Sequence, residues 1–264
     1  MNKIALAPTS LPNSPPLEYI DATRKAGYEA IGLRVFRSPG ITYPFYPIVD
    51  DPALARDVKK AIVDSGMEVV DVLSFYMQSE MDFDAMMKPL EFGKELGATY
   101  ALVIGDDPEW NRMVDNFGRF CDITANLGMI TSIEAPVVSR QVNRLEKAVN
   151  LIKQCGRSNA VICLDPMQFF RVGDTPEMLK GADPKLYPYT QMTDGYKDPA
   201  QGGRCALGEG GAPLYGILDN LVPDVPLSLE WPAPRDSNYT PAEWAKAALD
   251  GCKAYLNGYF ASKK

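Results

Sequence analysis

The regular alternation of strand-like and helix-like segments is the feature of this sequence that most constrains its fold. Short runs rich in Val, Ile and Leu are each followed by a longer segment with apolar residues at helical spacing, as in residues 30–36 before 50–66. Eight such pairs fit into the 264 residues. Among their segments we predict strands at residues 68–75 and 187–195 and a short helix near residues 174–182. Strict βα alternation over about 250 residues is typical of a closed parallel barrel. We therefore predict an α/β fold, a (β/α)8 TIM barrel, formed by residues 1–264 as one domain.

The junctions between segments support this prediction. Gly27, Gly66, Gly97 and Gly128 each end a helical segment just before a strand, where a left-handed C-cap favours glycine. An open doubly wound sheet is the alternative, and its first strand–helix loop usually carries a Gly-rich phosphate-binding turn. That loop here, residues 7–16, contains no glycine. The open sheet therefore ranks second.

The chain contains no histidine, and this restricts its chemistry. Ser-His-Asp and Cys-His nucleophile systems are excluded, as are the usual zinc sites built on imidazole. Acid–base chemistry must then use carboxylates, Lys, Tyr or Cys. The five cysteines are odd in number and form no CxxC motif, so we expect free thiols and a cytoplasmic protein.

The overall charge and hydropathy pattern indicate the kind of partner. The net charge of −7 argues against a nucleic-acid surface, which is usually a basic patch. No apolar run approaches the roughly 18 residues of a membrane helix. We expect a small-molecule substrate, no nucleic-acid partner and no membrane partner. Barrels of this kind often pair, so a homo-oligomer is one expectation.

Polar residues stand near the ends of four consecutive predicted strands in the second half of the chain. They are Glu134, Asp165, Gln191 and Glu230, separated by 31, 26 and 39 residues, each about one βα unit. In a barrel these ends meet at one mouth, where three carboxylates would repel one another. A divalent cation relieves that repulsion, and oxygen donors suit Mg²⁺ or Mn²⁺ better than Zn²⁺. Any one of these residues alone is equally well explained as a helix cap or an ion-pair partner.

Several segments resemble one known family. The segments are IEAPVV around Glu134, LDPMQ around Asp165, YTQMTDG around Gln191, RCALGEGGAPLYGIL, and LEWP around Glu230. Together they resemble the xylose-isomerase-like TIM barrels, the sugar phosphate isomerase/epimerase superfamily. The specific motifs lie within residues 130–232. The resemblance implies that Glu134, Asp165, Gln191 and Glu230 bind Mg²⁺ or Mn²⁺. Many members have histidine where Gln191 stands, but hydroxypyruvate isomerase-like members are similar to this chain in using glutamine as the fourth ligand.

The sequence also departs from the family pattern. Many members carry a histidine three residues after the strand-six aspartate, where this chain has Gln168. The epimerases often have a second glutamate six residues after the first, where this chain has Arg140. Endonuclease IV and xylose isomerase rely on histidines, so both of these activities are excluded.

The resemblance implies a function in carbohydrate metabolism. We expect a divalent-metal-dependent isomerase or epimerase of a small sugar or hydroxy-carbonyl substrate, acting through an enediolate with Glu134 and Glu230 as the acid/base pair. The first alternative is a metal-dependent lyase or dehydratase of a polyhydroxy or keto-sugar substrate on the same site. The second is a non-catalytic sugar-binding barrel, which the missing histidines motivate.

Four further residues are candidates for substrate binding. Arg204 matches a family arginine that reaches the substrate or the strand-eight glutamate. Arg140 has the bidentate geometry to hold a carboxylate or phosphate, although a solvated loop arginine is an equal alternative. Arg34 ends the second predicted strand, and Gln168 follows Asp165. The long aromatic loop at residues 36–52 is either a lid or a subunit interface.

Overall fold

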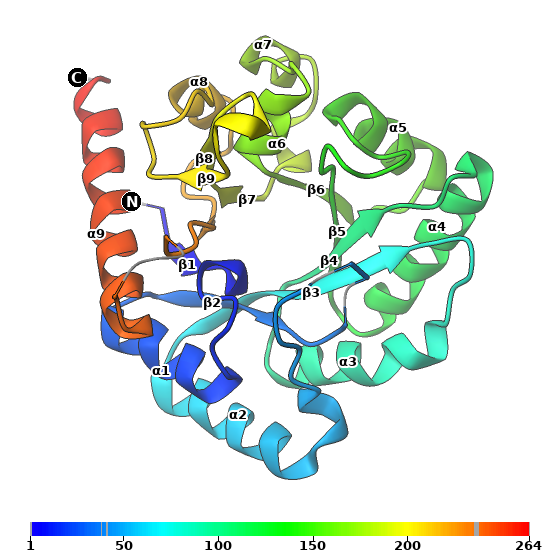
Figure 1. The fold of residues 1–264 in the computed structure, drawn as a ribbon. Coiled ribbons are helices and arrows are strands. Elements are labelled where there is room, and N and C mark those ends of the chain that lie inside the picture. Colours follow the sequence, from blue (N-terminus) through cyan, green and yellow to red (C-terminus); the bar gives the residue numbers. More distant parts are fainter. Residues whose placement is uncertain (1, 38, 41, 235–237, 264) are drawn as a thin grey trace.

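Eight parallel strands close into a barrel in the computed structural model, which describes residues 2–37, 39–40, 42–234 and 238–263 (Figure 1). The strands follow one another around the barrel in the order β1, β10, β7, β6, β5, β4, β3, β2. Their bounds are β1 (Ile4–Leu6), β2 (Ala30–Arg34), β3 (Glu68–Met77), β4 (Tyr100–Gly105), β5 (Ile130–Glu134), β6 (Ala160–Leu164), β7 (Tyr189–Met192) and β10 (Leu227–Leu229). The predicted TIM barrel is confirmed.

Helices surround the barrel on its outside (Figure 1). Their bounds are α1 (Pro16–Ala26), α2 (Pro52–Ser65), α3 (Phe83–Glu95), α4 (Trp110–Asn126), α5 (Leu145–Cys155), α6 (Pro166–Arg171), α7 (Pro176–Leu179), α8 (Leu214–Leu218) and α9 (Pro241–Ala261). Short 3-10 turns lie at η1 (Pro8–Ser10), η2 (Ile48–Asp50), η3 (Pro184–Leu186) and η4 (Pro199–Gln201). Within the described part of the chain, no helix combines the length and apolarity needed to cross a membrane.

The helix ends follow the local sequence. Gly27, Gly66, Gly97 and Gly128 all have positive φ, between 69° and 89°, as the predicted C-cap positions require. Asp51 is the N-cap of α2, and its side chain accepts hydrogen bonds from two backbone amides of the first turn. Local signals therefore determine where α1 to α4 end and where α2 begins.

Two predicted strands differ from the structure. The pattern predicts one strand over 187–195, but β7 ends at Met192, and Asp194–Gly195 forms a separate strand, β8, that pairs with β9 (Arg204–Cys205). The strand predicted at 68–75 continues to Met77, where it still pairs with β4. The short helix predicted near 174–182 is confirmed as α7, and α6, which the pattern does not predict, lies directly after β6. Both strand differences depend on pairing with residues distant in sequence, which a local pattern does not contain.

The buried apolar side chains form two layers. The larger lies between the strands and the helices, where Phe75, Phe117 and Phe120 are fully buried. Truncating one such phenylalanine to alanine typically costs about 3–5 kcal/mol. The smaller layer fills the barrel, where the rings of Tyr100 and Tyr189 stack 4.3 Å apart. This inner layer is the floor below the carboxyl ends of the strands.

Asp71 places a carboxyl group inside this floor. It is 1% exposed, and its Oδ2 accepts a hydrogen bond from the Tyr189 hydroxyl at 3.3 Å, whereas Oδ1 has no hydrogen-bond partner. Gly32 leaves room for it, because a Cβ on Gly32 would lie 2.3 Å from Asp71 Oδ1. Burial raises the pKa of Asp71 to about 7, against the opposite effect of the hydrogen bond from Tyr189.

We expect Asp71→Asn to remove part of the pH dependence of stability. Because the pKa is higher in the folded chain than in the unfolded chain, the protonated carboxyl favours folding at low pH, and this contribution is lost as the pH rises through about 7. Between pH 5 and pH 8 the wild type should lose about 3 kcal/mol relative to the variant, at about 1.4 kcal/mol per pKa unit. Urea unfolding of both proteins at the two pH values measures this difference. Parallel pH profiles would contradict the assignment.

Candidate active site

The four polar residues predicted near strand ends all lie at the carboxyl end of the barrel. Glu134 is the last residue of β5, whereas Asp165 and Glu230 directly follow β6 and β10. Gln191 lies within β7, opposite Ser228 of β10. All four are buried, between 3% and 8% exposed. Since the strands are parallel, their carboxyl ends bring these side chains to one mouth.

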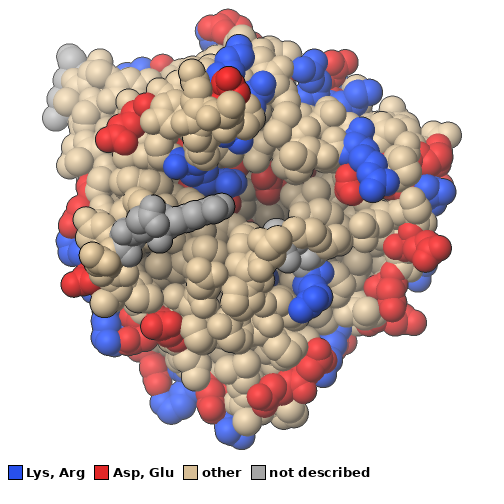
Figure 2. Space-filling model, viewed as in Figure 1, with Lys and Arg blue, Asp and Glu red and all other residues tan. Residues whose placement is uncertain are grey.

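A cavity of about 550 Å³ opens at this mouth. Its lining includes Glu134, Gln191, Arg204 and Glu230. Asp165 is not part of the lining, and its ion pair with Arg204 connects it to the cavity wall. Figure 2 shows the hollow at the centre of this face, with charged side chains of both signs spread around the rim. The volume suits a small molecule.

Arg204 connects two of the carboxylates. Its Nη2 lies 2.9 Å from Glu230 Oε1 and 3.5 Å from Asp165 Oδ2, with the side chain only 23% exposed. Burial alone would lower the pKa of Arg204, but the negative charges of Glu230 and Asp165 raise it overall. The guanidinium is therefore a permanent positive charge within the carboxylate cluster.

One arginine does not balance three carboxylates. The Glu134 side chain has neither a hydrogen bond nor an ion pair with any described residue, and burial together with the charges of Asp165 and Glu230 raises its pKa well above the ordinary value. Burial also raises the pKa of Asp165 to about 7, although Arg204 acts in the opposite direction. The site thus favours uptake of positive charge, either as protons or as a cation.

The oxygens of the cluster that accept no hydrogen bond match a hard divalent cation in chemistry. They are Asp165 Oδ2, Gln191 Oε1 and Glu230 Oε2, which are buried and accept no hydrogen bond from the described residues. A buried polar atom without a partner costs about 1–3 kcal/mol, and carboxylate and amide oxygens are ligands that Mg²⁺ and Mn²⁺ prefer. Among the residues that the structure describes, however, no three His, Cys, Asp or Glu side chains are already arranged around a metal position. To coordinate a cation, the side chains of the cluster must move. Asp165 and Glu230 must then bind the cation as well as Arg204.

Asp194 organises the loop that carries Arg204. Its Oδ1 accepts hydrogen bonds from the amides of Gly195 and Ala212, and its Oδ2 from those of Gly208 and Gly210, at 2.7–3.2 Å. The backbone of the loop approaches so closely that a Cβ on Gly210 would lie 2.2 Å from Asp194 Oδ1. A single carboxylate therefore holds both ends of the segment that extends over the mouth as β8 and β9 (Figure 1).

The other predicted substrate-binding residues also line the cavity. Arg34 lies at the end of β2 with its guanidinium 4.5 Å from the ring centre of Tyr43. Gln168 accepts a hydrogen bond from the amide of Val137 at 3.1 Å. The side chain of Arg140 is 62% exposed, and its closest acidic neighbour is Asp106 at 3.8 Å. The side chain of Arg140 is thus only weakly held in place.

Sequence reasoning missed Tyr76 and Gln78, which line the same cavity. Burial, with the charge of Glu134 adding to it, raises the pKa of Tyr76 to about 12, so its hydroxyl keeps its proton near neutral pH. The signal was the segment SFYMQ at the end of the third strand, which was expected to stop at Phe75. Extending that strand by two residues would have placed Tyr76 at the mouth.

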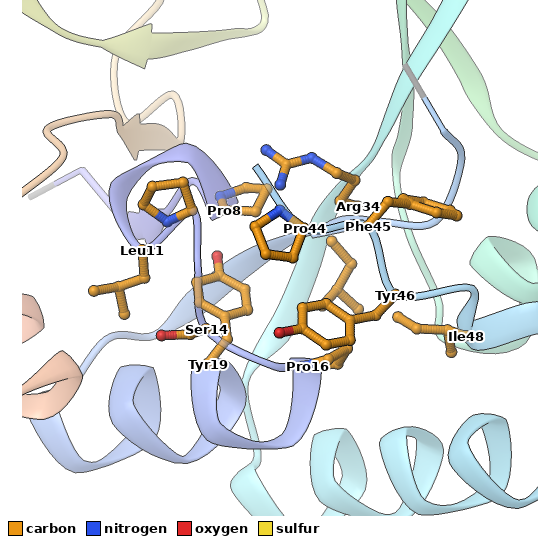
Figure 3. A pocket seen from close by; sticks show the side chains of 12 residues that line it. Pro8, Leu11, Ser14, Pro16, Tyr19, Arg34, Pro44, Phe45, Tyr46 and Ile48 are labelled. Carbon is orange, nitrogen blue, oxygen red and sulfur yellow. The ribbon is translucent and has the colours of Figure 1, made fainter. Parts of the chain in front are cut away.

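The loop that follows β2 folds back on its own chain. Figure 3 shows Pro44 and Tyr46 lying over Pro16 and Tyr19 of α1 around a cavity of about 30 Å³, room for about one or two water molecules. In the other direction, Tyr43 lines the carboxylate cavity. Both the lid and the interface interpretations of residues 36–52, of which residues 38 and 41 lie outside the described part, stay predictions.

Comparisons with known proteins agree with this architecture. The family model described as "Xylose isomerase-like TIM barrel" matches residues 20–255. A 3-dehydroshikimate dehydratase from Pseudomonas aeruginosa is 24% identical over 96% of this chain, which spans about two-fifths (41%) of that protein.

Solved structures with the same fold include the IOLI protein with a binding zinc atom, with a TM-score of 0.77, 19% identity, and coverage of 97% of this chain and 99% of that one. An L-ribulose 3-epimerase has a TM-score of 0.72 and 17% identity, with coverage of 100% of this chain and 97% of that one. At these identities the two structures support the fold alone.

We expect Asp194→Asn to loosen the loop at residues 195–212. In the variant an amide NH₂ replaces one carboxylate oxygen and faces two backbone N–H donors, so at least two hydrogen bonds are lost. Each donor left unpaired costs about 1–3 kcal/mol of stability. Hydrogen exchange at Gly208, Gly210 and Ala212 should accelerate more than tenfold, where tenfold corresponds to about 1.4 kcal/mol.

Asp198→Asn is the matched control, because Asp198 is exposed in the same loop and accepts one hydrogen bond, from the amide of Ala200. It should leave those three amides unchanged. Equal protection of the three amides in Asp194→Asn and the wild type would show that the loop does not depend on this carboxylate.

Proposed function

Because this chain belongs to the xylose isomerase-like TIM barrel family, we propose that it is a divalent-metal-dependent enzyme that isomerises or epimerises a small sugar or hydroxy-carbonyl compound. The observation that carries the proposal is the pair of buried glutamates Glu134 and Glu230, which line one cavity from β5 and β10. These strands are three positions apart around an eight-stranded barrel, so the two carboxyl groups flank a substrate from different sides.

The two glutamates have different surroundings, as an acid/base pair requires. Arg204 compensates the charge of Glu230 at 2.9 Å, whereas Glu134 has no such partner and a raised pKa. One carboxyl group accepts the proton from the carbon next to the carbonyl while the other supplies a proton. Return of a proton to the opposite face of the same carbon gives epimerisation, and return to the neighbouring carbon gives isomerisation.

The proposed cation ligands are Glu134, Asp165, Gln191 and Glu230. Mg²⁺ or Mn²⁺ bound there would stabilise the negative charge that develops on the substrate oxygens. The cavity wall includes Arg34, Arg140, Arg204 and Gln168, and the proposal assigns to them the orientation of the substrate by hydrogen bonds. Tyr76 adds a protonated hydroxyl on the β3 side.

Dehydration is the second candidate activity, and the similarity to a 3-dehydroshikimate dehydratase favours it. The same removal of a proton next to a carbonyl leads to loss of a β-hydroxyl group when the substrate carries one. Mass spectrometry separates the two activities, because dehydration gives a product lighter by one water and isomerisation leaves the mass unchanged.

We expect the purified wild type to bind one equivalent of Mn²⁺ or Mg²⁺, and Gln191→Ala to bind it at least about tenfold more weakly, because an oxygen ligand is lost. Titration calorimetry measures both affinities. Gln78→Ala is the control, since Gln78 is another neutral amide of the cavity, directly after β3, which lies four strands from β7. If neither the wild type nor Gln191→Ala binds a cation, the metal-dependent proposal fails and the non-catalytic sugar-binding interpretation replaces it.

We expect Glu134→Gln and Glu230→Gln each to lower turnover at least about 100-fold, since each removes one proton-transfer group. The assay is incorporation of deuterium from D₂O into candidate polyhydroxy ketones, followed by NMR. Glu95→Gln, at an exposed ion pair with Lys59, is the control and should retain full activity. Full activity in both glutamate variants would contradict the two-glutamate mechanism.

A further inference from the structure

A second and larger hollow lies beside the carboxylate cavity. Its volume is about 1060 Å³, compared with about 550 Å³ for the cavity that Glu134 and Glu230 line. Tyr43 and Arg204 line both, so the two spaces are neighbours that share these side chains. We call the second space the aromatic groove. Pockets for drug-sized ligands are typically about 300–1,000 Å³, so the cavity alone accommodates one small molecule and the groove adds room for more.

Aromatic rings form one wall of this groove. Trp231 and Tyr239 both pack against Trp244, with ring centres 4.9 Å and 5.4 Å apart. Trp244 is buried, whereas Tyr239 is 54% exposed. Prolines 232, 234 and 241 complete the wall. The buried ring therefore supports two others that remain available to a ligand.

The backbone couples this wall to the reaction cavity. Trp231 directly follows Glu230, its amide donates a hydrogen bond to Ser10 Oγ at 2.9 Å, and its carbonyl accepts one from the indole of Trp244 at 2.9 Å. Gly251 of α9 lets the Trp231 ring approach, since a Cβ there would lie 3.2 Å from it. The ring is thus held at a fixed place beside the Glu230 carboxylate.

The remaining lining of the groove mixes apolar and polar residues and is largely uncharged. Asn13, Ser14, Thr42 and Thr240 contribute neutral polar groups, and Glu209 contributes a carboxylate. Arg204 stands at the junction with the cavity, paired with Glu230. Rings with apolar faces and hydroxyl edges match such a lining, because the faces stack on aromatic side chains and the hydroxyls meet neutral hydrogen-bonding groups.

We propose that the substrate has two parts: a polyhydroxy carbonyl group that reacts in the carboxylate cavity, and a second ring, linked to it as in a glycoside, that binds in the aromatic groove on Trp231 and Tyr239. This inference rests on the proposed function, because it takes the carboxylate cavity as the reaction site. The lining that the two spaces share at Tyr43 and Arg204 argues for this occupant, since a group in the groove lies next to the cavity of the reacting group.

Three β-glucosides that differ only in the group attached to C1 test the proposal by binding alone. Methyl β-D-glucopyranoside has one ring, phenyl β-D-glucopyranoside adds an aryl ring, and cellobiose adds a second sugar ring. Titration calorimetry with the wild type in the presence of Mn²⁺ should give at least about tenfold tighter binding for a two-ring probe than for the methyl glucoside. Whichever two-ring probe binds more tightly identifies the second ring as aryl or sugar.

Trp231→Ala and Tyr239→Ala should each reduce the affinity for the two-ring probe about tenfold and leave the methyl glucoside unchanged. Tyr239→Ala keeps the test decisive if Trp231→Ala folds poorly, because Tyr239 is half-exposed. Trp110→Ala is the control, since Trp110 bonds to Gln154 away from the groove and should change no affinity.

Equal affinities for one- and two-ring probes, no binding of any two-ring probe, or equal effects of Tyr239→Ala on both kinds of probe would overturn the proposal. The proposed function fails separately, through loss of cation binding or of deuterium exchange, because the affinities are measured without turnover.

Discussion

The ion pair of Arg204 with Glu230, extended to Asp165, is the interaction on which the site depends. It places a permanent positive charge among three buried carboxylates that would otherwise repel one another at close range. With Arg204 alone the cluster keeps a net charge of about −2 if all three groups ionise, and one divalent cation would make it neutral. This balance explains why burial without a sufficient partner raises the pKa of Glu134 and Asp165.

The two partners of that ion pair are distant in sequence, so each must be held in place separately. Arg204 lies on a loop, and Asp194 holds this loop by four backbone hydrogen bonds directly beyond β7. The barrel holds the other partners, since hydrogen-bonded register sets the relative heights of Gln191 and Glu230. The sheet thus positions the carboxylates, and Asp194 positions the loop that carries the Arg204 guanidinium.

Local patterns predicted the barrel, the glycine caps and the end of β5 at Glu134. These features depend on periodicity and on backbone conformation within a few residues. The break of the seventh strand at Thr193 was not predictable in this way, because it arises from pairing of Asp194–Gly195 with Arg204–Cys205. Asp71 and Tyr76 were also missed, since only closure of the barrel reveals which polar residues of β3 face its interior or its mouth.

The sequence by itself determined the fold class, the absence of imidazole chemistry, and which carboxylates and amide stand near the strand ends, because these follow from residue identity and spacing along the chain. Only the tertiary structure decided that Arg204 occupies the carboxylate cluster, that the Glu134 side chain has no partner among the described residues there, and that an aromatic groove adjoins the cavity. The reason is that charge compensation and cavity shape depend on distances between side chains from separate strands and loops. Those distances exist only once the barrel has closed.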